Sequence, residues 1–376
     1  MTAAALALAA IAATLVLWSY VVYPSILRHL SRRAAPRASI SPSWPSVDVL
    51  VSAFDEETSI GPRVANLLAQ RYPGSLAVSV GCDGCRDRTA DRARESEGGR
   101  VRVAEFAERR GKAAVLNDLV DRSTSEVLVF TDANSSFAPD AVARLVERFA
   151  DPAVGAVCGR LLLEPADGTG FSPETEFWDR ETRLKEAEGK LGVCLGANGA
   201  IYATRRELVR PLPAGTVLDD FLIPARIGAD GHRVEFAGDA VAREPFSTDV
   251  AAEAARRLRI GIGAGGFLLR ERRLLDFRRR PRLALAFLSR KVARWLAPVF
   301  ALAAITTALF SSTLRPLALA LAAALTILAA SLALRPRLSG WPARLYYFGV
   351  INLALAAGIV AGLFGYRRPA WPRTAR

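Results

Sequence analysis

The chain has 376 residues, enough for one sizeable catalytic domain or two small ones. Hydrophobic residues make up 51% of it, a share that favours a protein lying partly in lipid over a fully soluble one. The net charge of +13 invites a nucleic-acid partner, but 13 Lys/Arg face only two acids between residues 256 and 294, a net of +11. Because little excess charge remains elsewhere, nucleic acid is not expected as a partner.

The N-terminal stretch, residues 1–27, carries no charge and is long enough to cross the roughly 30 Å of hydrocarbon in a bilayer. A cleaved signal peptide would begin with basic residues, whereas here the basic cluster from Arg28 to Arg37 follows the apolar run. We therefore expect an uncleaved transmembrane anchor and a basic linker over 28–45. This order predicts a multi-pass protein of the cell's inner membrane, with its N-terminus outside and its main domain in the cytosol.

From residue 46 onward, short β-type runs alternate with helical patterns. Strands are predicted at VDVLVSAF, LAVSVG, RVRVAEF and EVLVF, and helices at TSIGPRVANLLAQRY, DRTADRARESE, KAAVLNDLVDR and DAVARLVERFA. This alternation indicates an α/β domain with a mostly parallel sheet and helices on both faces. Ligands of such sheets bind beyond the carboxyl ends of the strands. Three polar loops fall there, SAFDEE, GCDGCRD and TDAN, and they predict a site on that rim.

The TDAN loop places Asp132 and Asn134 one residue apart at the end of a strand. Two oxygen-bearing side chains aimed to the same side suit a hard divalent cation that bridges phosphates. The alternative is an Asx turn or a helix cap. The next helix begins near Asp140, which is too far downstream for capping.

Two more polar positions precede predicted helices. Asp83, in GCDGCRD, is placed to accept hydrogen bonds from a nucleobase or a ribose. Lys112 follows a glycine at a helix start, where a phosphate is favoured, although a solvated lysine is the alternative. Cys82 and Cys85 form a C-x-x-C, but no second pair completes a zinc site, so free thiols are expected.

The adjacent acids Asp219 and Asp220 repel each other, so we expect one to be held by hydrogen bonds and the other to accept a proton. A helix cap is the alternative. Further on, Arg256 and Arg259 precede a glycine-rich stretch, IGIGAGG, that we predict to be a turn. Guanidinium groups there would neutralise a departing diphosphate, or they would bind lipid headgroups.

The C-terminal third combines basic and apolar segments. Residues 266–294 are predicted to form a basic amphipathic segment on anionic headgroups, with a solvated linker as the alternative. Within 295–366, three uncharged stretches are predicted to span the membrane, and a basic tail follows at 367–376. Four spans in all would leave this tail outside, against the positive-inside tendency, unless one C-terminal segment is re-entrant.

Seven motifs occur in order along residues 46–265, and they are SAFDEE, GCDGCRDRT, GKAAVLN, TDANSSFAPDAV, GANGAIYATRREL, LDDFLIPARIGADGHRV and RRLRIG. In this order they resemble the family 2 glycosyltransferases with a GT-A fold. The resemblance is to the membrane-embedded branch that includes cellulose, hyaluronan and poly-N-acetylglucosamine synthases. It implies a Rossmann-like GT-A domain over 46–265, and a nucleotide-sugar donor of which a UDP-sugar is the first expectation.

The resemblance also implies roles for individual residues. The residues expected along the donor are Ala53, Glu56, Asp83, Lys112, Asp132 and Asp219. Asp132 and Asn134 occupy the family's D-x-D, so they would hold Mg²⁺ or Mn²⁺ on the donor diphosphate. Asn134 stands where an Asp is usual, which removes one charge from this metal site.

At the acceptor end, Asp220 matches the family's acidic residue that deprotonates the acceptor hydroxyl. Arg256 and Arg259 match the Q/R-x-x-R-W motif near the diphosphate, and Ile260 replaces its Trp. We expect an inverting membrane glycosyltransferase that acts on a saccharide or lipid-linked acceptor in the synthesis of a surface polysaccharide or glycolipid. The alternatives are transfer of one sugar to a polyprenyl phosphate, and a catalytically silent nucleotide-sugar sensor or scaffold.

Overall fold

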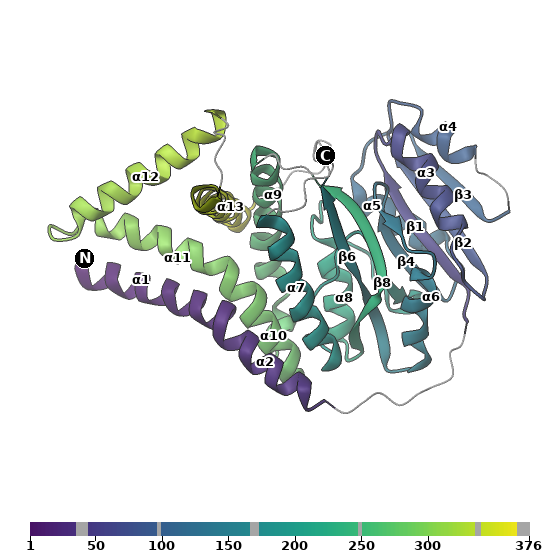
Figure 1. The fold of residues 1–376 in the computed structure, drawn as a ribbon, viewed down its shortest axis with the longest axis horizontal. Coiled ribbons are helices and arrows are strands. Elements are labelled where there is room, and N and C mark those ends of the chain that lie inside the picture. Colours follow the sequence, from purple (N-terminus) through teal and green to yellow (C-terminus); the bar gives the residue numbers. More distant parts are fainter. Residues whose placement is uncertain (35–43, 96–98, 166–172, 247–249, 335–339, 367–376) are drawn as a thin grey trace. The chain divides into compact units, whose positions relative to one another are not determined.

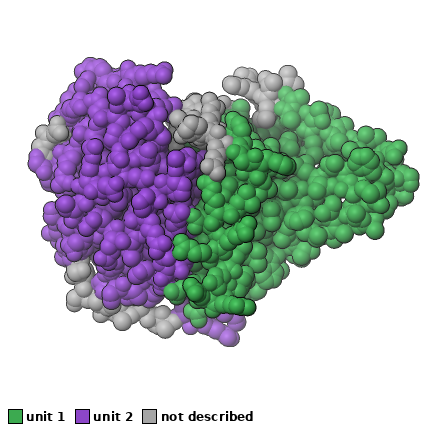
Figure 2. Space-filling model, turned by 180° about the vertical axis from the view of Figure 1, so that it is seen from behind, with its two compact units in different colours: residues 1–27, 248–367 green, residues 28–247, 368–376 purple. Residues whose placement is uncertain are grey.

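The computed structural model describes residues 1–34, 44–95, 99–165, 173–246, 250–334 and 340–366. Half of the predicted linker (28–45), residues 35–43, and all of the predicted tail (367–376) lie outside these ranges. The chain divides into two compact units, coloured separately in Figure 2. We call Met1–Leu27 with Thr248–Arg367 the helical unit, and Arg28–Ser247 with Arg368–Arg376 the sheet unit. The predicted domain bounds remain predictions.

The described part of the sheet unit contains one eight-stranded sheet in the order β3-β2-β1-β4-β7-β6-β8-β5 (Figure 1). The strands are β1 (Val47–Ala53), β2 (Leu76–Asp83), β3 (Val101–Phe106), β4 (Val127–Asp132), β5 (Ser136–Phe137), β6 (Val154–Pro165), β7 (Tyr202–Arg205) and β8 (Arg233–Phe246). The four predicted strands are confirmed as β1 to β4, and all pairs among them are parallel. The other half is mixed, because β7 runs antiparallel to β4 and β6, and β5 to β8. Elements as short as β5 and β7 carry no readable periodicity.

Helices cover both faces of the sheet, as predicted. They are α3 (Glu57–Leu68), α4 (Thr89–Arg94), α5 (Lys112–Arg122), α6 (Ala141–Val146), α7 (Pro173–Lys190) and α8 (Asp219–Ala229). Side chains alternate along β1, so that Val49 and Val51 share one buried cluster with Ile60 of α3. On the opposite face α5 packs closely, since a Cβ at Gly81 of β2 would meet Val115.

The carboxyl ends of the first strands share one edge. The parallel registers pair Ala53 with Cys82, and Ser52 with Asp132. The loops after β1, β2 and β4 therefore lie along one rim, as the sequence predicts. We call this edge the acidic rim, after the carboxylates described below.

The helical unit is built from long apolar helices. They are α1 (Thr2–Leu17), continued by the π-helix Trp18–Val22 and α2 (Tyr23–Arg32); α9 (Val250–Arg270); α10 (Pro281–Phe287), continued by the π-helix Leu288–Val292 and α11 (Ala293–Ala308); α12 (Arg315–Leu334); and α13 (Gly340–Leu363). Among the described residues, three helices are long and apolar enough to cross a membrane: Thr2–Arg32, Pro281–Ala308 and Leu345–Leu363. Four spans were predicted; the remaining one, in α12, is a shorter apolar helix, Arg315–Ser331.

The glycine-rich stretch after Arg259 is helical, and the predicted turn is wrong. It lies inside α9, which runs without a break to Arg270. A Cβ on Gly261 would stand 2.9 Å from the Cα of Gly358 in α13, so the two backbones are in direct contact there. Small residues four apart allow such close approach between apolar helices. The glycines therefore serve helix packing.

Candidate functional site

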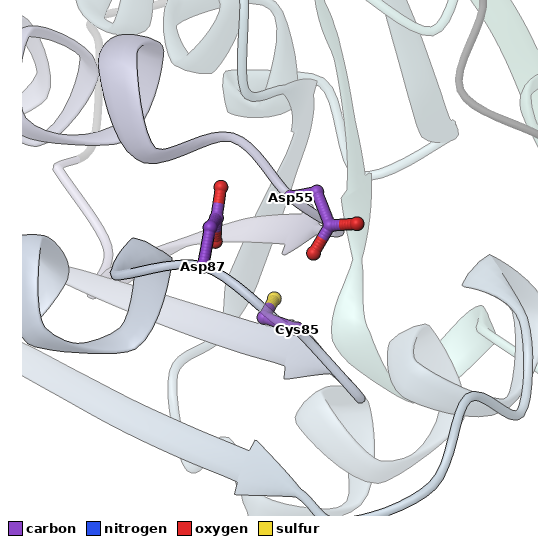
Figure 3. Close-up of side chains that lie close together, drawn as sticks. All are labelled: Asp55, Cys85 and Asp87. Carbon is purple, nitrogen blue, oxygen red and sulfur yellow. The ribbon is translucent and has the colours of Figure 1, made fainter.

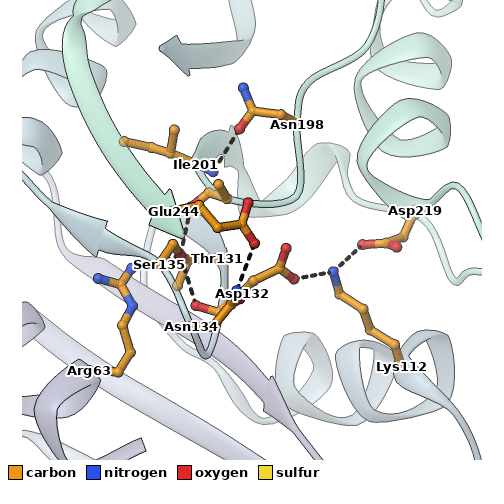
Figure 4. Close-up of polar contacts among 11 residues, drawn as sticks. Arg63, Lys112, Thr131, Asp132, Asn134, Ser135, Asn198, Ile201, Asp219 and Glu244 are labelled. Atoms are coloured by element: carbon orange, nitrogen blue, oxygen red, sulfur yellow. Dashed lines mark hydrogen bonds and ion pairs between the residues drawn. The ribbon is translucent and has the colours of Figure 1, made fainter. Parts of the chain in front are cut away.

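Lys112 stands at the centre of the acidic rim (Figure 4). It is the first residue of α5, directly after Gly111, whose φ of 92° reverses the chain before the helix. Its Nζ lies 2.9 Å from Oδ1 of Asp132, at the end of β4, and 3.3 Å from Oδ2 of Asp219, at the start of α8. Residues from three separate parts of the chain, all predicted for the site, thus meet at one ammonium group.

The pKa values of two groups on the rim indicate that a third carboxylate, that of Asp220, also lies near Lys112. Burial alone would lower the pKa of Lys112, but the charges of Asp132, Asp219 and Asp220 raise it above its usual range. The buried hydroxyl of Tyr202 also has a raised pKa, because of burial first and then of the same three carboxylates. Both groups therefore keep their protons at neutral pH. The three acids surround one region of the rim.

The adjacent acids differ in environment. The side chain of Asp219 is 6% exposed and pairs with Lys112. Asp220 is half-buried, and its backbone carbonyl accepts a hydrogen bond of 2.9 Å from the amide of Ala197. This is the division that mutual repulsion predicts, with one acid held and the other more open. The role of Asp220 as a base remains a prediction.

Asp83 supports the start of α5. It is 3% exposed, and its two carboxylate oxygens accept hydrogen bonds of 2.8 Å each from the amides of Arg110 and Gly111. Asp83 thus fixes the loop that presents Lys112. Its predicted contact with a base or ribose remains a prediction.

The turn that carries Asp132 rests on a buried arginine that the sequence analysis missed. Arg63 of α3 is 2% exposed and donates hydrogen bonds of 2.6 Å to the Thr131 hydroxyl and to Asn66 Oδ1. Burial lowers the pKa of Arg63 to about 9, opposed by the nearby charge of Asp132. An arginine on an amphipathic helix ordinarily faces solvent, so no sequence pattern marks it.

Two further residues of the site were missed. Gly199 lies against Asp132, so that a Cβ there would stand 2.8 Å from Oδ2 of the carboxylate. Glu244, on β8, accepts a hydrogen bond of 2.9 Å from the Asn134 side-chain amide. The GANG motif could have pointed to Gly199, whereas Glu244 follows an ordinary strand pattern.

The loops after β1 and β2 are fastened together beside the rim, where Asp55, Cys85 and Asp87 converge (Figure 3). Asp55 accepts a hydrogen bond of 2.8 Å from the amide of Arg86, and Asp87 accepts one of 3.1 Å from the amide of Glu57. Each loop thus binds the backbone of the other. All four cysteines of the chain are free, as predicted.

The remaining predicted residues lie in different places. Ala53 is buried at the end of β1, and the amide of Glu56 donates a hydrogen bond of 2.7 Å to the Thr89 hydroxyl, so both lie on the rim side of the loops. Arg256 and Arg259 belong to α9 in the helical unit. Their predicted place near a diphosphate is untested and remains a prediction.

The donor set of the rim fits a hard divalent cation. Asp132 and Asn134 offer carboxylate and amide oxygens, which Mg²⁺ and Mn²⁺ prefer. The buried Oδ2 of Asp219 accepts no hydrogen bond from the described residues beyond its ion pair with Lys112 at 3.3 Å. The rim already stabilises one positive charge, that of Lys112. The residues present thus suit the expected Mg²⁺ or Mn²⁺.

The fold and the rim define an α/β domain of the GT-A type. A mannosyltransferase from Pyrobaculum calidifontis, solved in complex with GDP-Man and Mn²⁺, is similar with a TM-score of 0.67 and 26% identity, over 95% of this chain and 99% of that one. Residues 45–263, more than half of the chain, match the family described as Glycosyltransferase like family 2. The chain belongs to this family.

Curated relatives match the same region. An N-acetylglucosaminyltransferase of Rhizobium meliloti (strain 1021) is 28% identical over 219 residues, covering 52% of this chain and 50% of the relative. Another N-acetylglucosaminyltransferase, from Azorhizobium caulinodans, is 26% identical over 198 residues, covering 51% and 50%. The chain spans about half the length of these relatives.

Proposed function

We propose that this protein is a glycosyltransferase that moves a sugar from a nucleoside-diphosphate donor to a hydroxyl acceptor, with inversion at the anomeric carbon. The observation that carries the proposal is the meeting of Asp132, Asp219 and Asp220 around Lys112 at the carboxyl rim of the sheet. Family membership and the GT-A fold support it. The names of the curated relatives favour a hexosamine donor, and the structural neighbour adds GDP-sugars to the UDP-sugars expected first.

In this proposal the rim receives the donor diphosphate. Asp132 and Asn134 would hold Mg²⁺ or Mn²⁺, which supplies positive charge to the leaving diphosphate. The neighbouring carboxylates raise the pKa of Lys112, so at neutral pH it contributes a positive charge beside the same group. Asp83 keeps the loop before Lys112 in place through the amides of Arg110 and Gly111.

In this proposal, Asp220 is the base that accepts the proton of the acceptor hydroxyl. Its neighbour Asp219 is tied to Lys112, which leaves Asp220 as the more accessible carboxylate of the pair. The acceptor oxygen forms its bond to the anomeric carbon as the bond to the diphosphate oxygen breaks, and the acceptor proton passes to Asp220. A single displacement of this kind inverts the anomeric centre.

Asp220→Asn tests this assignment. A general base contributes about 10²–10⁴-fold to a rate, so we expect a loss of that size in transfer and little change in nucleotide affinity. Asp219→Asn, which removes a structural partner of Lys112, serves as the comparison. Equal losses of transfer and of nucleotide binding in Asp220→Asn would show that Asp220 is structural.

One assay on membranes that contain the full chain distinguishes the possible classes of acceptor. Labelled UDP- and GDP-sugars are supplied with Mg²⁺ or Mn²⁺, and the products are separated by size and solvent extraction. We propose a surface polysaccharide or glycolipid, and a large retained product supports the polysaccharide. A small organic-extractable product supports a lipid-linked acceptor, including a polyprenyl phosphate, and a lack of metal-dependent label in every case contradicts the proposed activity.

We also propose an inner-membrane topology with three spans, in which α12 does not cross. The basic cluster after the first helix keeps the sheet unit in the cytosol. Two further crossings, at Pro281–Ala308 and Leu345–Leu363, return the arginine-rich tail to the cytosol as well. This arrangement removes the conflict with the positive-inside tendency that four spans create.

Cysteine labelling in intact spheroplasts tests the topology. Ser312→Cys and Pro342→Cys place single exposed thiols before α12 and at the start of α13. If α12 does not cross, a membrane-impermeant maleimide labels both. Labelling of Ser312→Cys alone would mean that α12 spans the membrane.

A further inference from the structure

The turn that would hold the cation carries one negative charge fewer than an Asp-x-Asp pair. Asn134 occupies the second position of the Asp-x-Asn pair, so the turn itself offers one carboxylate, Asp132, and one neutral amide. A divalent cation next to a diphosphate is favoured by negatively charged oxygen ligands. The missing charge can come only from elsewhere in the fold.

Glu244 lies where that charge is needed. Its strand, β8, runs antiparallel to β5, and the pairing of Ser136 with Arg243 sets the register. The same register puts Glu244 beside the residues just before β5. There its Oε1 accepts a hydrogen bond of 2.9 Å from Nδ2 of Asn134, 110 residues away in the sequence (Figure 4).

This hydrogen bond also orients the Asn134 amide. Because the NH₂ group of Asn134 donates to Glu244, its carbonyl oxygen is the atom left for another partner. The amide oxygen is the metal-binding atom of an asparagine. One contact thus holds the carboxylate of Glu244 next to Asn134 and leaves the right atom of Asn134 for a cation.

We infer that Glu244 provides the second carboxylate of the cation site, in place of the acid that Asn134 lacks. The donor set is then Asp132, Asn134 and Glu244, with the same two negative charges as an Asp-x-Asp pair. The inference rests on the proposed cation site, and it adds a residue that no motif marks.

The test measures Mn²⁺ binding to the purified full chain by electron paramagnetic resonance, in the presence of a nucleoside diphosphate and without any sugar acceptor. Glu244→Gln keeps the shape and the hydrogen-bond acceptor but removes the charge. We expect it to weaken Mn²⁺ binding by at least about 10–100-fold, because that range applies to residues that only support a ligand, and a ligand itself contributes at least as much. The control is Glu164→Gln, which removes an exposed carboxylate on the neighbouring strand β6 and should leave Mn²⁺ binding unchanged.

A charge exchange tests whether the cation requires a second carboxylate at this site. In Asn134→Asp with Glu244→Gln, the carboxylate moves from position 244 to position 134, and we expect most of the lost Mn²⁺ affinity to return. Thermal unfolding without metal confirms that each variant is folded. Wild-type affinity in Glu244→Gln, or an exchange variant as weak as Glu244→Gln, overturns the inference. Because sugar transfer is not measured, a wild-type protein that binds Mn²⁺ but transfers no sugar would contradict only the proposed function.

Discussion

Replacing Lys112 tests how the rim is held together. Lys112→Met removes the positive charge that lies 2.9 Å from Asp132 and 3.3 Å from Asp219. At an effective dielectric constant of about 20, one such pair is worth roughly 5 kcal/mol before costs. The Lys112 side chain is 34% exposed and that of Asp132 25%, so screening and desolvation reduce the net effect. We predict a loss of about 2 kcal/mol in the free energy of unfolding at pH 7, most of it from buried Asp219.

The loss of stability in Lys112→Met should depend on pH in a characteristic way. The raised pKa of Lys112 means that its contribution is fully present below its unfolded value of about 10.5 and fades only at higher pH. The stability difference between wild type and variant should therefore stay constant from about pH 7 to pH 9.

The assay is chemical unfolding of the detergent-solubilised full chain, followed by tryptophan fluorescence. Asp219→Asn in the Lys112→Met background should recover at least half of the lost stability, because no buried charge then remains at position 219. Lys112→Arg is the control that keeps the positive charge. Wild-type stability in Lys112→Met, or no recovery in the double variant, would refute the reasoning.

Three further predictions concern single positions. Gly199→Ala should weaken Mn²⁺ binding without changing any charge, because its Cβ would lie 2.8 Å from Asp132 Oδ2. Gly61→Ala, with open space around it, is the matched control, and equal Mn²⁺ affinities in the two variants would contradict the geometry. Cys85 should react with iodoacetamide with a midpoint near pH 7, because the hydrogen bond from Cys82 lowers its pKa to about 7; a midpoint near the usual value of about 8.5 would count against that contact. Gly261→Val should separate α9 from α13 and lower the melting temperature, whereas Gly266→Val should not, because there is space for a side chain at position 266. Equal decreases in melting temperature would argue against close packing of the two helices.

The half of the fold that the sequence predicts is the half with strong periodicity. Strands β1 to β4 and the helices between them alternate regularly, and parallel connections then bring Ala53, Asp83 and Asp132 to one edge. Within the mixed half, β5 and β7 escape prediction because they are two and four residues long. Their pairing is decided by tertiary contacts, which local propensity does not encode.

The residues of the candidate site also divide into those that the sequence predicts and those that it does not. Asp132, Asp219 and Lys112 stand in polar loops or at helix starts, so their motif positions predict them. Arg63 and Glu244 could not be predicted, since each acts through a contact with a residue 68 or 110 positions away. The glycines after Arg259 were assigned to a turn because glycine has two uses, and only the helix packed against them decides between them.

The most direct test of the account is to locate the cation. Crystals or grids of the full chain are prepared with a nucleoside diphosphate and Mn²⁺, and the Mn²⁺ position is taken from anomalous scattering or from density that depends on the metal. We predict one site on the acidic rim, in contact with the Asp132 carboxylate and with the diphosphate. A nucleotide bound away from Asp132, or metal density only at other carboxylates, would contradict it.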